Sequence, residues 1–431
     1  MIPRLLSPYA IRDAGYYPIV TITGPRQSGK TTLAKAAFPN HEYLSLEDTE
    51  TRSFARDDPK GFLTRHSGPA IFDEAQRVPD LFSGLQTAVD KDASPGRFIL
   101  TGSQNFLLLK EVSQSLAGRS GILHLLPFSR AELDRRPQSE PGDPLKLFAN
   151  RKPGPDVPSL PDLWETIRTG FYPRIHDRGI PPEIWLADYV QTYIERDVRS
   201  LVNIGDLDTF ERFLGLVAGR VGQLLNYSSL ASDAGVSVDT ARRWISVLKT
   251  SFIVFALSPH HRNFNKRLIK SPKLYFFDTG LACYLLGLRS RVQLETHPLR
   301  GALFENFVIA EVAKAYFHHR RQPPLYFWRD RIGHEVDLLI EEGGALYPME
   351  MKSGATVGGD MLDGLLWWCR LSGRSERKGK EREEGPEERE GMGKAREEKG
   401  GEITGTRAAL VYGGDDAYER RGVAVRPWFS I

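Results

Sequence analysis

The segment that most constrains this chain is GPRQSGKTT at positions 24–32. It matches the pattern G-x-x-x-x-G-K-[ST], which predicts a phosphate-binding loop when it lies between a strand and a helix. An apolar, β-branched run at 19–23 precedes it, and a helix-compatible run at 33–38 follows it. We therefore expect the backbone N–H groups of this loop, together with the helix N-terminus behind it, to bind nucleotide phosphates.

Each residue type in the loop has an expected role. Gly24 and Gly29 permit the turn, Lys30 reaches the β- and γ-phosphates, and the Thr31 hydroxyl binds Mg²⁺. The expected cofactors are therefore ATP and Mg²⁺. The alternative, a chance glycine-rich turn before a helix, fits the flanking strand and helix patterns less well. The candidate nucleotide-binding residues are Gly24, Pro25, Arg26, Gln27, Ser28, Gly29, Lys30, Thr31 and Thr32.

An acidic pair follows the next strongly apolar run. Residues 70–72 read as a strand, and Asp73 and Glu74 come directly after them. Magnesium-nucleotide chemistry requires such acids, because Asp73 can hold Mg²⁺ directly or through water and Glu74 can accept a proton from the attacking water. The alternative is a solvated strand end.

Further strands are expected at 43–46, 97–100 and 122–126. Strands that alternate with helical stretches predict an α/β fold, a parallel sheet with helices on both faces, whose ligands lie at the carboxyl edge. After the strand at 97–100, Gln104 or Asn105 is a candidate to orient the hydrolytic water, or else a helix cap. Arg119 is a candidate to stabilise transition-state charge, or else an ordinary surface arginine.

Composition limits the other classes. The 431 residues suit two or three domains, and a net charge of +3 confines any nucleic-acid surface to a local patch. Cys283 and Cys369 are too few for a disulfide framework, which indicates a reducing compartment. The chain start lacks a signal-peptide core and no apolar run of about 18 residues occurs, so we expect a cytoplasmic protein without a membrane partner.

The middle of the chain predicts a linker, helices and a small DNA-binding unit. Residues 134–161 read as a linker and 185–198 as a helix. A helix-turn-helix pattern ends in a helix at 238–250, and two short strands would form a wing around a cationic loop. The alternative is a packing or protein-interaction module. The basic residues concerned are Arg242 and Arg243 in the helix and His260, His261, Arg262, Lys266, Arg267, Lys270 and Lys273 in the loop.

A hairpin of carboxylates is expected near the carboxyl end. Strands at 335–342 and 345–352 flank Gly343-Gly344, a favoured two-residue turn. Such a turn places Asp337 opposite Glu350, and Glu335 opposite Lys352. Two facing carboxylates repel unless a cation lies between them, and oxygen ligands suit Mg²⁺ or Mn²⁺. The alternative is a solvated strand face with a Glu–Lys pair.

Two neighbouring segments complete this region. Glu305, on an expected helix at 302–311, has the apolar neighbours typical of a ligand, so the candidate second metal centre is Glu305, Asp337, Glu350 and Lys352. A tract rich in Arg, Lys, Glu and Gly at 374–402 cannot bury apolar surface. Apolar runs return at 408–412 and 423–425, which makes the tract an insertion.

The chain resembles the prokaryotic AAA-type ATPases whose C-terminal domain has a restriction-endonuclease-like core. The segments that carry the resemblance are TGPRQSGKTTLA, AIFDEAQ, ILTGSQN, SLAGRSGILHLLPFS, TGFYPRI, YIERDV, FFDTGLACYLLG, GALFENFV and GHEVDLLI with PMEMKSG. The resemblance implies an AAA-type ATP-binding domain at 1–130, a linker and helical segment at 131–200, a winged-helix-like domain at 201–285 and a restriction-endonuclease-like domain at 286–431. It puts Asp73 and Glu74 at the magnesium and water-activating positions, and Glu305, Asp337, Glu350 and Lys352 at the nuclease-like positions.

Three functions are compatible with this organisation. The first is an ATPase that couples its nucleotide state to a DNA-handling C-terminal half. The second is a metal-dependent DNA endonuclease gated by ATP. The third is an ATP-switched interaction protein whose nuclease-like domain is inactive. A homo-oligomer is a further expectation.

Overall fold

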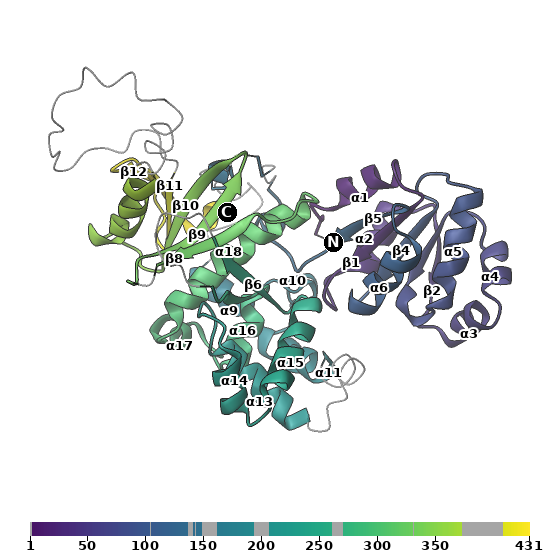
Figure 1. The fold of residues 1–431 in the computed structure, drawn as a ribbon, viewed down its shortest axis with the longest axis horizontal. Helices are drawn as coiled ribbons and strands as arrows, with labels where there is room; N and C mark the ends of the chain where they lie inside the picture. Colours follow the sequence, from purple (N-terminus) through teal and green to yellow (C-terminus); the bar gives the residue numbers. More distant parts are fainter. Residues whose placement is uncertain are drawn as a thin grey trace, which may run out of the picture.

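The computed structural model describes residues 2–103, 105–136, 141–142, 144–148, 162–193, 207–260, 270–330, 332–372 and 408–431. Within them, a five-stranded sheet and an eight-stranded sheet lie on opposite sides of the molecule, and a helical region lies between and below them (Figure 1). No helix in this described part is long and apolar enough to cross a membrane. Cys283 and Cys369 are both buried.

The N-terminal sheet has the order β2-β3-β4-β1-β5, and all its strand pairs are parallel, as the sequence predicts. Its strands are β1 (Ile19–Thr23), β2 (Glu42–Ser45), β3 (Ala70–Asp73), β4 (Phe98–Gly102) and β5 (Ser120–His124). Its helices are α1 (Ser7–Ala14), α2 (Lys30–Ala37), α3 (Thr49–Asp57), α4 (Pro59–Arg65), α5 (Asp80–Lys91) and α6 (Asn105–Ser115).

Both faces of this sheet are covered, because alternate residues of each strand enter different cores. Phe98 and Leu100 of β4 pack in one cluster with α4 and α5, whereas Ile99 packs in the other with α1 and α2. The carboxyl ends of β1 and β3 therefore remain at an edge between the two helical layers, where the phosphate loop and the acidic pair lie.

The middle of the chain is helical. Its elements are α7 (Arg130–Leu133), α8 (Pro144–Leu147), α9 (Leu163–Thr169), α10 (Pro173–Arg178), α11 (Pro182–Tyr193), α13 (Leu207–Ala218), α14 (Tyr227–Ala234), α15 (Val238–Thr250), α16 (Thr279–Leu285) and α17 (Arg291–Thr296). The expected helix-turn-helix is present as α14 and α15. Gly235 ends α14 in the left-handed conformation, and the Ser237 hydroxyl caps α15 at Thr240 N.

The C-terminal sheet has the order β12-β13-β11-β10-β9-β8-β6-β7 and mixes parallel with antiparallel pairs. Its strands are β6 (Val254–Pro259), β7 (Lys273–Phe276), β8 (Leu325–Arg329), β9 (Glu335–Glu342), β10 (Ala345–Lys352), β11 (Ala408–Tyr412), β12 (Tyr418–Arg420) and β13 (Val423–Pro427). The predicted hairpin is confirmed: Ala345 pairs with Glu342 and Met349 with Leu338, around glycines at φ 59° and 78°. The tract at 374–402 lies outside the described residues.

The prediction of a free two-stranded wing is wrong. β6 and β7 do pair antiparallel after α15, but Ser258 and Pro259 of β6 also pair with β8, so the two strands form one edge of the C-terminal sheet. Lys273, expected in the cationic loop, is buried in β7. Residues 261–269 of that loop lie outside the described residues, and Lys270 is exposed.

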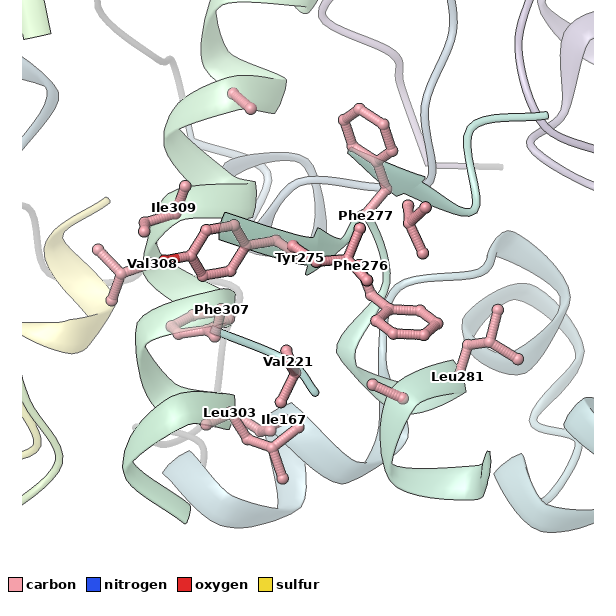
Figure 2. Packing of buried hydrophobic residues seen from close by; sticks show 14 of the residues in the cluster. Ile167, Val221, Tyr275, Phe276, Phe277, Leu281, Leu303, Phe307, Val308 and Ile309 are labelled. Atoms are coloured by element: carbon pink, nitrogen blue, oxygen red, sulfur yellow. The ribbon is translucent and has the colours of Figure 1, made fainter. Parts of the chain in front are cut away.

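The long helix α18 (Arg300–His318) connects the parts of the molecule. Its apolar side chains pack in one continuous cluster with the middle helices, β7 and one face of the C-terminal sheet. Figure 2 shows Phe307, Val308 and Ile309 of α18 beside Tyr275 and Phe276. Near its C-terminal end, α18 contacts the N-terminal unit, where Arg320 pairs with Asp13 of α1.

Candidate functional site

The phosphate loop follows β1 in the predicted strand–loop–helix arrangement. Gly24 has φ 147°, and a Cβ there would lie 2.1 Å from the Leu125 carbonyl oxygen, so only glycine fits against β5. Gly29 has φ 91° and precedes the first residue of α2. Lys30 is buried, and its Nζ donates to the carbonyls of Gly24 at 3.1 Å and Pro25 at 2.7 Å. The lysine ammonium group therefore lies against the phosphate loop, where it is expected to bind nucleotide phosphates.

Asp73 stands at the end of β3 and faces the loop. The Thr31 hydroxyl donates to its two carboxylate oxygens at 3.1 and 3.0 Å, and the Tyr43 hydroxyl donates to Oδ2 at 2.7 Å. The Thr101 hydroxyl of β4 is a third donor. Burial and the hydrogen bond to Asp73 raise the pKa of Tyr43 to about 12, so this phenol stays protonated. The sequence predicted that Thr31 and Asp73 belong to one site, but it did not indicate that Tyr43 and Thr101 also bond Asp73.

Glu74 occupies a left-handed conformation (φ 56°, ψ 44°) directly after Asp73. Its Oε2 accepts bonds from Gln76 Nε2 at 2.5 Å, Ser103 Oγ at 2.9 Å and Ser103 N at 3.3 Å. Non-glycine residues held in this backbone region cost about 1–3 kcal/mol and cluster at functional sites. Gln76, just after β3, and Ser103, just after β4, thus hold the Glu74 carboxylate in place.

A cavity of about 1140 Å³ opens over the phosphate loop. Its walls come from the N-terminal segment, the loop and α2, the ends of β3 and β4, and α10 of the helical middle. Arg174 and Arg178 of α10 also line this cavity. The sequence analysis did not predict that these two arginines take part in the nucleotide site. Basic side chains outnumber acidic ones on these walls, which suits a polyanion: Arg4, Arg26, Lys30, Arg174 and Arg178 against Glu47, Glu74 and Asp177.

The two remaining sequence candidates of this unit have different outcomes. Arg119 is not near the phosphate loop of its own chain, so its assignment to that site is wrong. It precedes β5 at the amino edge of the sheet, where it forms an exposed ion pair with Asp90 at 2.6 Å. The phosphate loop lies at the opposite, carboxyl edge. Gln104 lies outside the described residues, and Ser103 beside it bonds Glu74.

The residues at the phosphate loop fit a magnesium nucleotide. Mg²⁺ prefers few protein oxygens and takes its other ligands from phosphates and water. The Thr31 hydroxyl and the Asp73 carboxylate, 3.0 Å apart at the mouth of a basic cavity, provide that kind of donor set. Thr31 and Asp73 would hold the ion, which would neutralise phosphate charge when bound.

The second predicted centre is assembled as a buried ion-pair network. Glu305 Oε1 accepts from Lys273 Nζ at 2.9 Å and Tyr275 Oη at 2.5 Å, and Lys273 also pairs with Glu335. Glu350 pairs with Lys352 at 2.5 Å. The sequence predicted a metal ion as the positive charge between these carboxylates, and in the structure Lys273 supplies that charge. No spacing in the sequence indicated this role for Lys273.

The carboxylates of this network repel one another. Burial, and then the charge of Asp337, raises the pKa of Glu305 to about 7 and that of Glu350 to about 8. The Asp337 Oδ2 accepts from Met351 N at 2.9 Å. Burial alone would lower the pKa of Lys273, but its acidic neighbours raise it above the ordinary value. Both lysines are therefore charged at neutral pH.

This network is only partly suited to a metal. Glu350 Oε2 is buried without a hydrogen-bond partner, which leaves an acceptor open to a cation. Within the described part of the chain, however, no three His, Cys, Asp or Glu side chains are arranged as a metal-ligand set. The predicted Glu–Lys pair is present as Glu350 and Lys352; Glu350 is buried, whereas the Lys352 side chain is 36% exposed.

Comparisons with known proteins divide the chain into three parts. Residues 16–133 match the AAA domain, 160–292 a domain of unknown function (DUF8612) and 300–429 another domain of unknown function (DUF4143). The chain is 33% identical over 343 residues to the uncharacterized protein Rv2008c of Mycobacterium tuberculosis, covering 79% of this chain and 71% of the relative.

Two more distant similarities span most of the chain. The uncharacterized protein MJ1544 of Methanocaldococcus jannaschii is 24% identical over 344 residues, covering 75% of this chain and 72% of that protein. The solved Walker-type ATPase PABY2304 of Pyrococcus abyssi is 16% identical, covers 65% of this chain and 94% of its own, and superposes with a TM-score of 0.37.

The parallel sheet, the phosphate loop and the acidic pair at its edge define an ATP-binding, AAA-type ATPase, in agreement with the AAA domain match. The chain belongs to the same family as Rv2008c of Mycobacterium tuberculosis, with which it shares most of its length.

Proposed function

We propose that this protein hydrolyses ATP with Mg²⁺ and uses its nucleotide state to control a DNA-handling C-terminal half. The observation that carries the proposal is that Lys30, Thr31 and Glu74 line one basic cavity, which α10 of the middle region also lines, with Asp73 hydrogen-bonded to Thr31 at its edge. Lys30 and Thr31 bind the phosphates and magnesium, Asp73 supports the ion and Glu74 activates water. A cytoplasmic location and a homo-oligomer stay predictions.

Support for nucleic-acid contact comes from α14 and α15. Arg242 and Arg243 are exposed on α15, the second helix of the pair, which is the helix that enters the major groove in helix-turn-helix proteins. Because the net charge of the chain is only +3, the DNA-handling part of the proposal depends on this local patch. The ATPase rate measured with and without duplex and single-stranded DNA tests it. Arg242→Ala with Arg243→Ala should remove any stimulation by DNA.

The nucleotide site is tested by Lys30→Ala. The lysine contacts the loop carbonyls and faces the cavity, so its loss should abolish ATP binding measured by calorimetry in Mg²⁺. Lys60→Ala, an exposed lysine on α4, is the matched control and should bind ATP as the parent does. ATP hydrolysis by Lys30→Ala at the parent rate would show that the site is wrongly assigned.

A second candidate is an ATP-gated, metal-dependent DNA endonuclease. The buried Glu350 Oε2, which lacks a partner beside Asp337, favours it. Plasmid incubated with the protein, Mn²⁺ and ATP should then be cut, and Asp337→Ala or Glu350→Ala should prevent cutting. Cutting that survives both substitutions eliminates this centre. No cutting and no Mn²⁺ binding by the folded protein favours the third function, an ATP-switched interaction protein with an inactive nuclease-like domain.

A further inference from the structure

Arg4 contacts the phosphate loop from outside every motif in the sequence. It precedes α1, and its side chain is only 8% exposed. Its guanidinium donates to three acceptors: Nη1 to the Ser28 carbonyl at 2.7 Å, Nη2 to the Leu126 carbonyl at 2.6 Å and Nε to Glu132 at 3.0 Å. One side chain thus ties the loop to the segment after β5 and to a buried carboxylate.

The Ser28 carbonyl belongs to the peptide that also carries the Gly29 N–H. Because a trans peptide is planar, its N–H points away from its C=O. A carbonyl held by Arg4 therefore fixes the direction of the Gly29 N–H, a backbone group of the kind that binds phosphate in such loops. Gly29, at φ 91°, has no side chain to restrain this peptide, and a Cβ there would lie 3.8 Å from Arg4 Nη1.

Glu132 holds Arg4 in this position. It is fully buried in the capping box of α7 and accepts from Leu5 N at 2.8 Å and Ser129 N at 3.0 Å. Burial opposes its ionisation, but the charge of Arg4 helps to keep its pKa below the ordinary value, so it is anionic at neutral pH. Its other oxygen lies 3.8 Å from His318 Nδ1, at the end of α18.

We infer that Arg4 is a positioning residue of the nucleotide site, which orients the Ser28–Gly29 peptide toward the β-phosphate and is itself fixed by Glu132. The inference rests on the proposed binding of ATP at the phosphate loop. It assigns no chemistry to Arg4, because the guanidinium already donates to two carbonyls and a carboxylate of the protein. Glu132 also lies near the C-terminal end of α18, the helix that carries Glu305 nearer its other end.

The test compares ADP with AMP, because only ADP places a phosphate at the β position. Calorimetry on Arg4→Met should show an ADP affinity reduced about tenfold or more, as for a lost hydrogen bond to a charged donor, with AMP affinity changed less than threefold. Arg4→Lys should recover little of the loss, since an ammonium cannot reproduce the planar fork that serves three acceptors. Arg12→Met, on α1 with its side chain 45% exposed, is the control and should bind both as the parent does.

The other outcomes of the ADP and AMP measurements also decide whether Arg4 is a positioning residue. Equal ADP affinity in Arg4→Met and the parent, or an equal loss for ADP and AMP, overturns the positioning role. If Arg4→Met does not fold, Glu132→Gln replaces it, because the amide keeps the shape but loses the charge that fixes Arg4. An ADP-selective loss in Glu132→Gln supports the inference, and parent-like ADP affinity overturns it. A parent protein that binds no ADP refutes the proposed function itself.

Discussion

Among single residues, Glu74 is held in a left-handed backbone conformation that is costly for a residue with a side chain. Its left-handed backbone turns the carboxylate away from the β3 direction, and bonds from Gln76 and Ser103 fix the side chain beside the cavity. Asp73, one position earlier, is instead surrounded by three hydroxyl donors. Two adjacent acids thus have different environments, which suits one to a magnesium ion and the other to water activation.

Replacing Glu74 with glutamine should separate binding from hydrolysis. The amide retains the size of the side chain but cannot accept a proton, and general-base catalysis contributes about 10²–10⁴-fold to a rate. We expect kcat for ATP to fall within that range, while ATP affinity measured by calorimetry stays near the parent value. Glu47→Gln removes another carboxylate from the same cavity wall and should leave kcat nearly unchanged. Equal rates for Glu74→Gln and the parent would contradict the assignment.

The residues found by sequence reasoning are those whose role is local. Lys30 and Thr31 follow from the loop pattern, and Asp73 follows from its position after a strand. Arg4 and Lys273 could not be found this way, because each acts on residues far away in the chain: Arg4 on Ser28 and Glu132, Lys273 on Glu305 and Glu335. Arg119 was misplaced for the related reason that a position next to a strand does not reveal which edge of the sheet it occupies.

Among the elements, α18 is joined to the backbone of β7 by a buried amide, in addition to the bonds that Glu305 accepts from Lys273 and Tyr275. Asn306 Oδ1 accepts from Phe276 N at 2.7 Å, and its Nδ2 donates to Phe276 O at 2.8 Å. β7 is an edge strand, so without this amide both backbone groups would lack a strand partner on that side. The clamp lies next to Glu305 on the helix and next to Tyr275 on the strand, beside the packing shown in Figure 2.

Asn306→Leu should therefore be strongly destabilising. Leucine has a similar volume but leaves the Phe276 N–H and C=O without partners in the core, and each such group costs about 1–3 kcal/mol. We expect the free energy of unfolding, from urea titration, to fall by about 2–4 kcal/mol. Leu303→Ile, a volume-conserving change at a buried position of the same helix, should cost less than about 1.5 kcal/mol. A smaller loss for Asn306→Leu than for Leu303→Ile would refute the clamp.

Element boundaries were predictable where the pattern is strong. The β9–β10 hairpin has the expected strands and turn because alternating residues and a Gly-Gly pair specify both locally. The pairing of β6 with β8 was not predictable, since it joins Ser258 to Tyr326 across an intervening stretch that contains α16, α17 and α18. Because of this long-range pairing, β6 and β7 form an edge of the C-terminal sheet and not a separate wing.

Across the whole molecule, two buried histidines mark the junction between the N-terminal unit and α18. His124 of β5 packs against Phe317 at 5.6 Å and Phe252 at 5.3 Å between ring centroids. His318 is fully buried, 3.8 Å from Glu132. Burial lowers the pKa of each to about 4, although the charge of Glu132 partly opposes this for His318. Both imidazoles are therefore neutral in the folded protein at pH 7.

This junction should make the protein sensitive to acid. Each histidine has a pKa near 4 when folded and about 6.5 when unfolded, so between these values the unfolded state binds more protons. The stabilisation is complete above pH 6.5 and is lost as the pH falls toward 4, by up to ~1.4 kcal/mol per pH unit for each histidine. Urea unfolding at pH 7, 6 and 5 measures the slope in the parent and in His124→Phe with His318→Leu. The raised pKa values of Glu305 and Glu350 give both proteins a slope of the opposite sign, so the histidine contribution is the difference, and the double variant should lose less stability in acid than the parent. Phe317→Leu loosens the same junction without removing a titrating group, so it should lower stability at every pH and keep the slope. A parent-like slope in the double variant would show that the acid sensitivity arises elsewhere in the chain.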